Sequence, residues 1–141
     1  MRRYAAIVTG DRHATRREWG DVVRDVLEGA LPALGNLTIL HGDASGIDTI
    51  ADVLINERWP MVPLLVYPAQ WDVFRAAGNP NAAGPERNNR MLRHLIAFGD
   101  AGYDIRVLAF HNFIDNSRGT KNMVEQARRA NVPVRIFTSR G

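Results

Sequence analysis

The 141-residue sequence has no cysteine, a single lysine at position 121 and no long apolar run. The lack of cysteine excludes disulfides, thiolate nucleophiles and Cys-based metal sites, and it is typical of a reducing compartment such as the cytoplasm. No run reaches the length of a membrane span, and the apolar run after the basic first residues is too short for a signal peptide. We therefore expect a cytoplasmic protein without membrane partners, forming one domain over residues 1–141.

Arginine supplies every other cation, and the net charge is only +3. Arginine excess is compatible with phosphate or nucleic-acid recognition, and equally with a biased codon composition. The arginines are scattered and acids interleave with them, as in "RREWGDVVRDVLE" at 16–28. This pattern is typical of a solvated helix face and does not favour nucleic acid as a partner.

Short apolar segments alternate with segments of helical periodicity along the chain. The irregular stretches are a break at 31–36 and a Gly-, Pro- and Asn-rich excursion at 69–85, before a helix with Pro85 in its first turn. The pattern predicts an α/β, Rossmann-like three-layer sandwich, with a mostly parallel sheet of about five or more strands and helices on both faces. The expected strands are 4–10, 37–40, 62–68, 105–110 and 132–137, and the expected helices are 15–30, 46–58, 85–98 and 119–130.

Parallel sheets bind ligands at the carboxyl ends of their strands, which selects the loops after residues 9, 40, 67 and 110. The loop "HGDASGID" at 41–48 has the glycines of a phosphate loop, but it also contains Asp43 and Asp48. Asp48 has two interpretations, an N-cap of the following helix or a ligand for ribose hydroxyls.

Two further residues favour a ligand at this edge of the sheet. Arg87 lies near a helix N-terminus, where a cation opposes the helix dipole and a bound anion would compensate it. Trp71, in the Gly- and Pro-rich excursion, is the best candidate for stacking on a base, although a core position is equally possible. The histidines form no pair at ligand spacing, so no metal site is predicted; they are His13, His41, His94 and His111.

The motifs Gly10-x-Arg12, "HGDASGIDTIA", "YPAQW", "AGPERNNRM" and "VLAF" leading to Gly119-Thr120 occur in this order over nearly the whole chain. In this combination the sequence resembles the SLOG superfamily of Rossmann-like nucleotide-binding domains, specifically its small stand-alone YspA-like branch. That superfamily also contains the LOG and DprA domains. The resemblance implies a pocket for a nucleotide or nucleotide-derived ligand and no required cofactor.

Carried over by position, Gly42, Gly46 and Asp48 fall on the second-strand loop motif. Arg87, Asn88 and Met91 fall on the arginine-containing helix motif, and Gly119-Thr120 falls on the phosphate-binding turn. The full expected ligand-binding set is Gly10, Asp11, Arg12, His41, Gly42, Asp43, Ser45, Gly46, Asp48, Trp71, Arg87, Asn88, Met91, Arg118, Gly119 and Thr120.

Three functions follow, in order of preference. The first is a sensor or sequestering module for a nucleoside phosphate or an ADP-ribose-type ligand. The second is a LOG-like hydrolase of an N-glycosidic bond, with Asp48, Asp43 or Glu86 as candidate catalytic residues. Here Asn122 and Met123 stand where LOG enzymes carry a glutamate, which favours binding over hydrolysis. The third is a DNA-binding accessory protein, and a homo-oligomer is compatible with each.

Overall fold

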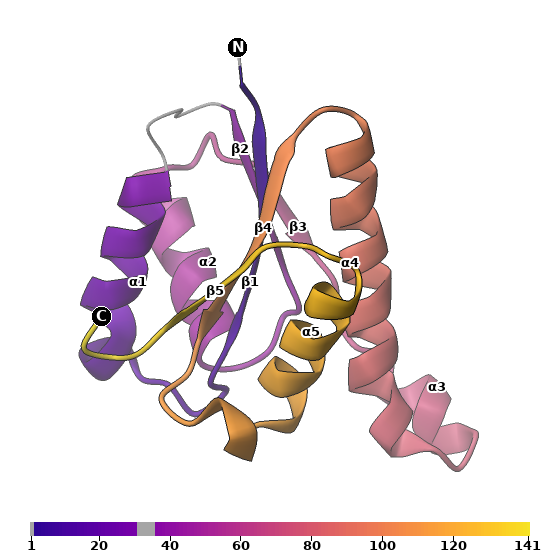
Figure 1. The fold of residues 1–141 in the computed structure, drawn as a ribbon. Coiled ribbons are helices and arrows are strands. Elements are labelled where there is room, and N and C mark those ends of the chain that lie inside the picture. The colour runs from indigo at the N-terminus through magenta and orange to yellow at the C-terminus, as the bar shows by residue number, and fades with distance from the viewer. Residues whose placement is uncertain (1, 31–35) are drawn as a thin grey trace.

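The computed structural model describes residues 2–30 and 36–141, so most of the break expected at 31–36 lies outside the described residues. Strands and helices alternate along the chain (Figure 1). The strands are β1 (Tyr4–Gly10), β2 (Leu37–His41), β3 (Leu64–Val66), β4 (Asp104–Phe110) and β5 (Val134–Phe137). The helices are α1 (Arg16–Ala30), α2 (Ile47–Arg58), α3 (Trp71–Ala76), α4 (Ala83–Asp100) and α5 (Arg118–Arg129), with short 3-10 turns η1 (Pro80–Ala82) and η2 (Ile114–Asn116).

The five strands form one sheet in the order β3-β2-β1-β4-β5, and every neighbouring pair is parallel. β1 lies at the centre, where Ile7 is in register with Leu40 of β2 and Val107 of β4. The strand order reverses between β1 and β4. In open parallel sheets, this reversal marks the edge at which ligands bind.

The two faces of β1 pack against different pairs of helices, because successive side chains of a strand point to opposite faces. Ala6 and Val8 join a core cluster with Trp19 of α1 and Ile47 of α2. Ala5 and Ile7 join a second cluster with residues of α4 and α5, among them Met91, Leu95 and Met123. Helices therefore cover both faces of a five-stranded parallel sheet, and the predicted fold class is confirmed (Figure 1).

Two local predictions were wrong. The segment 69–85, expected to be irregular, contains helix α3, turn η1 and the first residues of α4. The six residues Trp71–Ala76 form about 1.7 helical turns before Gly78 adopts a φ of 76°. The third strand was expected to be buried over 62–68, but β3 spans Leu64–Val66 at an edge of the sheet and Val66 is 44% exposed. Trp59 follows the last residue of α2, as the Trp-Pro pair predicted.

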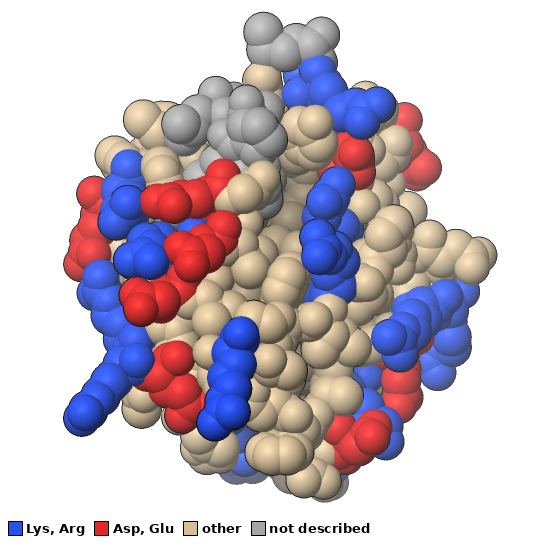
Figure 2. All heavy atoms as spheres, turned by 60° about the vertical axis from the view of Figure 1, so that its left-hand side comes forward, with Lys and Arg blue, Asp and Glu red and all other residues tan. Residues whose placement is uncertain are grey.

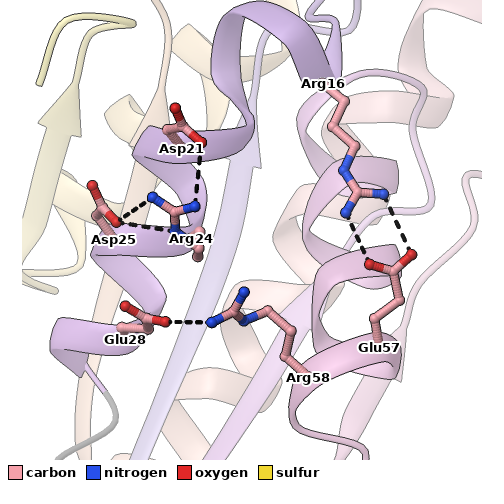
Figure 3. A network of polar contacts seen from close by, with 7 residues as sticks. All are labelled: Arg16, Asp21, Arg24, Asp25, Glu28, Glu57 and Arg58. Atoms are coloured by element: carbon pink, nitrogen blue, oxygen red, sulfur yellow. Dashed lines mark hydrogen bonds and ion pairs between the residues drawn. The ribbon is translucent and has the colours of Figure 1, made fainter.

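The outer faces of α1 and α2 are joined by two ion pairs (Figure 3). Arg16 donates from both terminal nitrogens to Glu57, at 2.8 and 3.4 Å, and Arg58 donates to Glu28 at 2.9 Å. Within the described residues, no helix has both the length and the apolar character that crossing a bilayer requires.

Candidate functional site

The loops after β1 and β2 are packed backbone to backbone. Gly46 has a φ of 77°, and a Cβ at this position would lie 2.6 Å from the carbonyl carbon of Arg12. The amide of Ile47 donates to the carbonyl of Asp11 at 3.1 Å, and the Ser45 hydroxyl donates to the carbonyl of Arg12 at 2.9 Å. The glycine is needed here because only a residue without a side chain permits both the left-handed backbone and this close approach.

Gly10 has a similar role at the end of β1. A Cβ on this residue would lie 2.6 Å from a side-chain carbon of Ile47 and would also clash with the carbonyl oxygen of Phe110. The next amide, that of Asp11, donates to the same Phe110 carbonyl at 2.9 Å. The ends of β1 and β4 and the start of α2 therefore converge at the strand-order reversal.

Asp48 closes the loop after β2 from the first turn of α2. The side chain is 5% exposed, and its Oδ2 accepts the amides of Gly42 at 3.0 Å and Ala44 at 3.2 Å. The N-cap position itself belongs to Gly46, which makes no side-chain cap, so the N-cap interpretation of Asp48 was wrong. Burial raises the pKa of Asp48, while the neighbouring His41, the two backbone hydrogen bonds and the charge of Arg87 oppose that rise.

His41 fixes the backbone at the end of β2. Its ring is 1% exposed; Nδ1 accepts the amide of Asp43 at 3.0 Å, and Nε2 lies 2.7 Å from Oδ2 of Asp52. Because Nδ1 accepts a hydrogen bond, the ring proton lies on Nε2 and is donated to Asp52. Asp43 follows with a φ of 56°, a left-handed conformation that aspartate tolerates. Its side chain is exposed at the mouth of the loop.

Arg87 of α4 reaches the ends of two strands. Its Nη1 donates to the carbonyl of Gly42 after β2 and lies 3.5 Å from the carbonyl of Tyr67 after β3, while its Nε donates to Asn88 Oδ1 at 3.0 Å. Burial lowers the pKa of Arg87, and the negative charge of Asp48 opposes that effect. A half-buried guanidinium is thus held in place by neutral carbonyls, with a carboxylate near it.

Asn88 extends this network to the start of α5. It is 3% exposed, and its Nδ2 donates to the carbonyl of Gly119 at 3.2 Å and to Oδ1 of Asn122 at 3.1 Å. Gln126 donates to the same Asn122 oxygen at 2.7 Å. A continuous chain of hydrogen bonds therefore runs from the loop after β2, through α4, to the first turns of α5.

The start of α5 is capped from within the chain. Ser117 is the N-cap, and its hydroxyl accepts the amide of Thr120 at 3.1 Å. Thr120 is 2% exposed, whereas Arg118 and Gly119 are exposed. The first turn of α5 contains no acidic residue, which leaves the positive end of its helix dipole without a carboxylate from that turn.

The structure brings most of the predicted residues into this arrangement, with three exceptions. Met91 is 1% exposed within the core cluster beneath α4, so it packs in the core. Glu86 pairs with Arg90 at 3.4 Å. Trp71 is 50% exposed on α3, where its ring lies 3.9 Å from the position of a Cβ built on Gly84. It lies beside the N-terminus of α4 and is not part of the core.

Four residues of the network were not predicted: Asp52, Tyr67, Asn122 and Gln126. Asp52 lies one turn after Asp48 on the same face of α2, a spacing that the sequence contains and that could have identified it. Tyr67 is 7% exposed and forms a 2.7 Å hydrogen bond with Nδ1 of His94, and burial raises its pKa. Asn122 and Gln126 are also one turn apart, and their sequence position gave no signal beyond that spacing.

No metal cluster marks this edge among the residues that the structure describes. Over residues 2–30 and 36–141, no three His, Asp or Glu side chains converge as metal ligands would. A shallow groove of about 290 Å³ lies elsewhere, between α4 and α5. Charged and polar side chains contact one another more closely at the strand ends than in this groove, so we place the candidate site at the strand ends.

The sheet order and its helical layers define an α/β protein with polar groups gathered at the carboxyl ends of its strands. No family model matches the sequence, and no curated protein matches it. Among solved structures, the chain is similar to the solution NMR structure of a de novo designed PLOOP2X3 fold protein. The identity is 13%, the TM-score is 0.45, and the alignment covers 96% of this chain and 81% of the designed one.

Proposed function

We propose that the protein binds a nucleoside phosphate or an ADP-ribose-type ligand at the carboxyl ends of its strands, as a sensor or sequestering module. The observation that carries the proposal is the position of Arg87. The half-buried guanidinium of Arg87 contacts the loop after β2. Through Asn88 it is linked to the start of α5, whose first turn contains no acidic residue. The resemblance of the sequence motifs to SLOG domains supports the same ligand class.

The phosphate would lie between Arg87 and the first turn of α5. Arg87 donates to described residues through Nε and Nη1. Its other terminal nitrogen, Nη2, takes part in none of these hydrogen bonds and is the atom that would donate to the anion. An anion at this position would gain charge-assisted bonds from the guanidinium and favourable interaction with the helix dipole. Arg118, exposed at the first position of α5, supplies a second cation on the solvent side.

The ribose would face the loop after β2. Both backbone hydrogen bonds of Asp48 are accepted by Oδ2. Oδ1 accepts neither of them and is the oxygen that would accept from a ribose hydroxyl. Asp43 is exposed on the same loop, where its backbone has the left-handed conformation. Carboxylate oxygens accept hydrogen bonds from the vicinal hydroxyls of ribose, so the acids select the sugar while the cations hold the phosphate.

Calorimetric titration with AMP, ADP-ribose, NAD and inorganic phosphate tests the proposal. Arg118→Ala should weaken AMP and phosphate alike by about tenfold, the value of one charge-assisted hydrogen bond. Asp43→Asn, which keeps a residue suited to the left-handed backbone, should weaken AMP but leave phosphate unchanged. Arg128→Ala, at the far end of α5, is the matched control. Absence of binding by every one of these ligands at millimolar concentration would exclude this function.

Hydrolysis of an N-glycosidic bond is a second candidate, favoured by one observation. The burial that raises the pKa of Asp48 places a carboxyl group of elevated pKa beside the expected sugar, which is a property of general acids. Release of free base from nucleoside monophosphates, followed by chromatography, measures this activity. Loss of that release in Asp48→Asn, with AMP binding retained, would support hydrolysis, and binding without any released base would leave the protein a binding module.

A further inference from the structure

The two helical layers of the molecule carry opposite charge. Helices α1 and α2 contain four Arg against seven Asp and Glu, a net charge of −3. Helices α4 and α5 contain seven Arg and Lys against three Asp and Glu, a net charge of +4. Because these layers cover opposite faces of the sheet, the fold separates charge across the molecule (Figure 1).

The acidic layer has a continuous stripe on α1. Glu18, Asp21, Asp25 and Glu28 are spaced three, four and three residues apart, so they lie along one side of the helix. All four are exposed. Figure 2, which brings the α1 side of the molecule forward, shows acidic side chains gathered on that side with basic ones among them.

The partners of this stripe within the chain are themselves at least partly exposed. Glu28 accepts a hydrogen bond from Arg58 at 2.9 Å, with both side chains nearly half exposed, and Glu18 accepts one from Asn112 at 3.3 Å. Arg24 contacts Asp21 at 3.3 Å and Asp25 at 3.1 Å, but these two aspartate side chains are 88% and 64% exposed. Exposed ion pairs of this kind contribute little and are readily exchanged. A second set of cations approaching α1 from outside would therefore compete with Arg24.

The basic layer offers a groove between α4 and α5. The half-buried Ile96 and the core residue Leu92, only 4% exposed, line its apolar part. Asn89 and Gln126 provide amides, and Arg93 and Arg129 provide charge. Within the described part of the chain, neither arginine has an acidic partner within 4.0 Å. In contrast, three of the four arginines of the acidic layer are paired with acids: Arg16, Arg24 and Arg58.

We propose that this groove receives helix α1 of a second copy of the same chain. The acidic stripe of one copy would face Arg93 and Arg129 of the next, and the half-exposed Val22 beside the stripe would approach the apolar part of the groove. The contact joins two different surfaces and is therefore heterologous, so it continues from copy to copy unless a ring closes. Its strength falls with added salt, because it depends on exposed charges.

A nucleic acid is the other polyanion that such a layer would attract. The groove favours the second copy because a sugar-phosphate backbone has no apolar ridge to place against Leu92 and Ile96. The same chain carries both the negative stripe on α1 and the positive groove, so one copy has the surface that the groove of the next copy would bind.

Sedimentation velocity of the full chain at about 20 mM and at 500 mM NaCl tests the proposal, since the Debye length shortens several-fold between them. At low salt the weight-average mass should rise with protein concentration, and at high salt it should equal that of one chain. Arg93→Glu/Arg129→Glu and Asp21→Arg/Asp25→Arg should each abolish the rise. Mixing these two variants in equal amounts should restore association in alternating order. The intact acidic stripe of the first variant would face the intact groove of the second, and the two reversed surfaces also carry opposite charge.

Arg2→Glu/Arg140→Glu is the matched control, since it changes the net charge equally outside both helical layers and should leave association intact. A mass independent of salt and concentration would overturn the proposal, and so would equal loss of association in the control. Binding of a fluorescent single-stranded oligonucleotide that is lost in Arg93→Glu/Arg129→Glu would also overturn it, in favour of nucleic acid. Two further measurements serve as controls. Circular dichroism establishes that each variant is folded. Titration of each variant with AMP tests the site at the strand ends independently, so failure of the association proposal and failure of the ligand-binding proposal can be distinguished.

Discussion

The guanidinium of Arg87 occupies the space that a side chain at Gly42 would need. A Cβ built on Gly42 would lie 2.7 Å from Cζ of Arg87 and 3.0 Å from its Nε, although the two residues are 45 positions apart. The contact joins the loop after β2 to helix α4. It makes position 42 a test of whether Arg87 is held as the structure describes.

Gly42→Ala should lower the free energy of unfolding by about 1–3 kcal/mol, because the guanidinium must move or the loop must open. Chemical denaturation measures the change. Gly29→Ala is the control, since a Cβ on Gly29 of α1 meets no atom within 4 Å and alanine is the better helix former by about 0.5–1 kcal/mol. Equal stability of Gly42→Ala and the wild type would contradict the described contact.

Asn88→Ala should lower the free energy of unfolding by about 1–3 kcal/mol, because it leaves Nε of Arg87 and the carbonyl of Gly119 without their buried partner. Thermal unfolding followed by circular dichroism measures the loss. Asn89→Ala, the exposed neighbour with one 3.4 Å contact to Gln126, should change stability by less than about 0.5 kcal/mol. Similar effects of the two variants would mean that the α4–α5 network adds nothing to stability.

The buried carboxyl of Asp48 should make stability depend on pH. Because its folded-state pKa is raised, its protonated form is favoured by folding, and this contribution is complete below the unfolded pKa of about 3.9. It is lost as the pH rises through the folded-state pKa. Asp48→Asn lacks the titration, so the free energy of unfolding of the wild type should fall relative to this variant as the pH rises above about 4. The fall should be about 1.4 kcal/mol for each pH unit that separates the folded-state pKa from the unfolded one.

Denaturant titrations of the wild type and Asp48→Asn, from acidic to neutral pH, measure this difference. If the difference in free energy of unfolding between the two proteins is the same at every pH, the buried Asp48 carboxyl does not make stability depend on pH.

The ion pair between Arg16 and Glu57 should matter little despite its two-nitrogen geometry (Figure 3). Both side chains are more than half exposed, so solvent and salt screen their attraction. Arg16→Ala should shift the midpoint of thermal unfolding by about 2 °C or less, and by less still in 1 M NaCl. A larger shift that persists at high salt would show that the pair contributes more than its exposure implies.

The sequence predicted the layers of this fold because short apolar strands and amphipathic helices have distinct periods. Ile7 and Leu40 lie in runs too short for helices, whereas Trp19 and Leu27 recur at helical spacing. The excursion at 69–85 was misread because its Gly, Pro and Asn content suggested irregular backbone, and the helix α3 it contains is only six residues long.

The candidate site was predictable only in part. Loop positions such as Gly42 and Asp48 carry a local signal, since a glycine-containing loop between a strand and a helix is a pattern typical of ligand-binding loops. Partners across helices carry none: Asn88 and Asn122 are 34 residues apart, and only the packing of α4 on α5 joins them. The sequence allows Asp48 to be an N-cap because it does not reveal the positive φ of Gly46, the residue that holds this position in the structure.

Both outer strands of the sheet are short and bordered by proline. β3 has three residues between Pro63 and Pro68, and β5 has four residues after Pro133. Proline lacks the amide that strand pairing requires, and short edges give an incoming strand few groups to bind. The sheet is therefore poorly suited to growth by addition of strands from other chains, a route that leads to aggregation, and contacts between folded copies are left to the side chains of the helices.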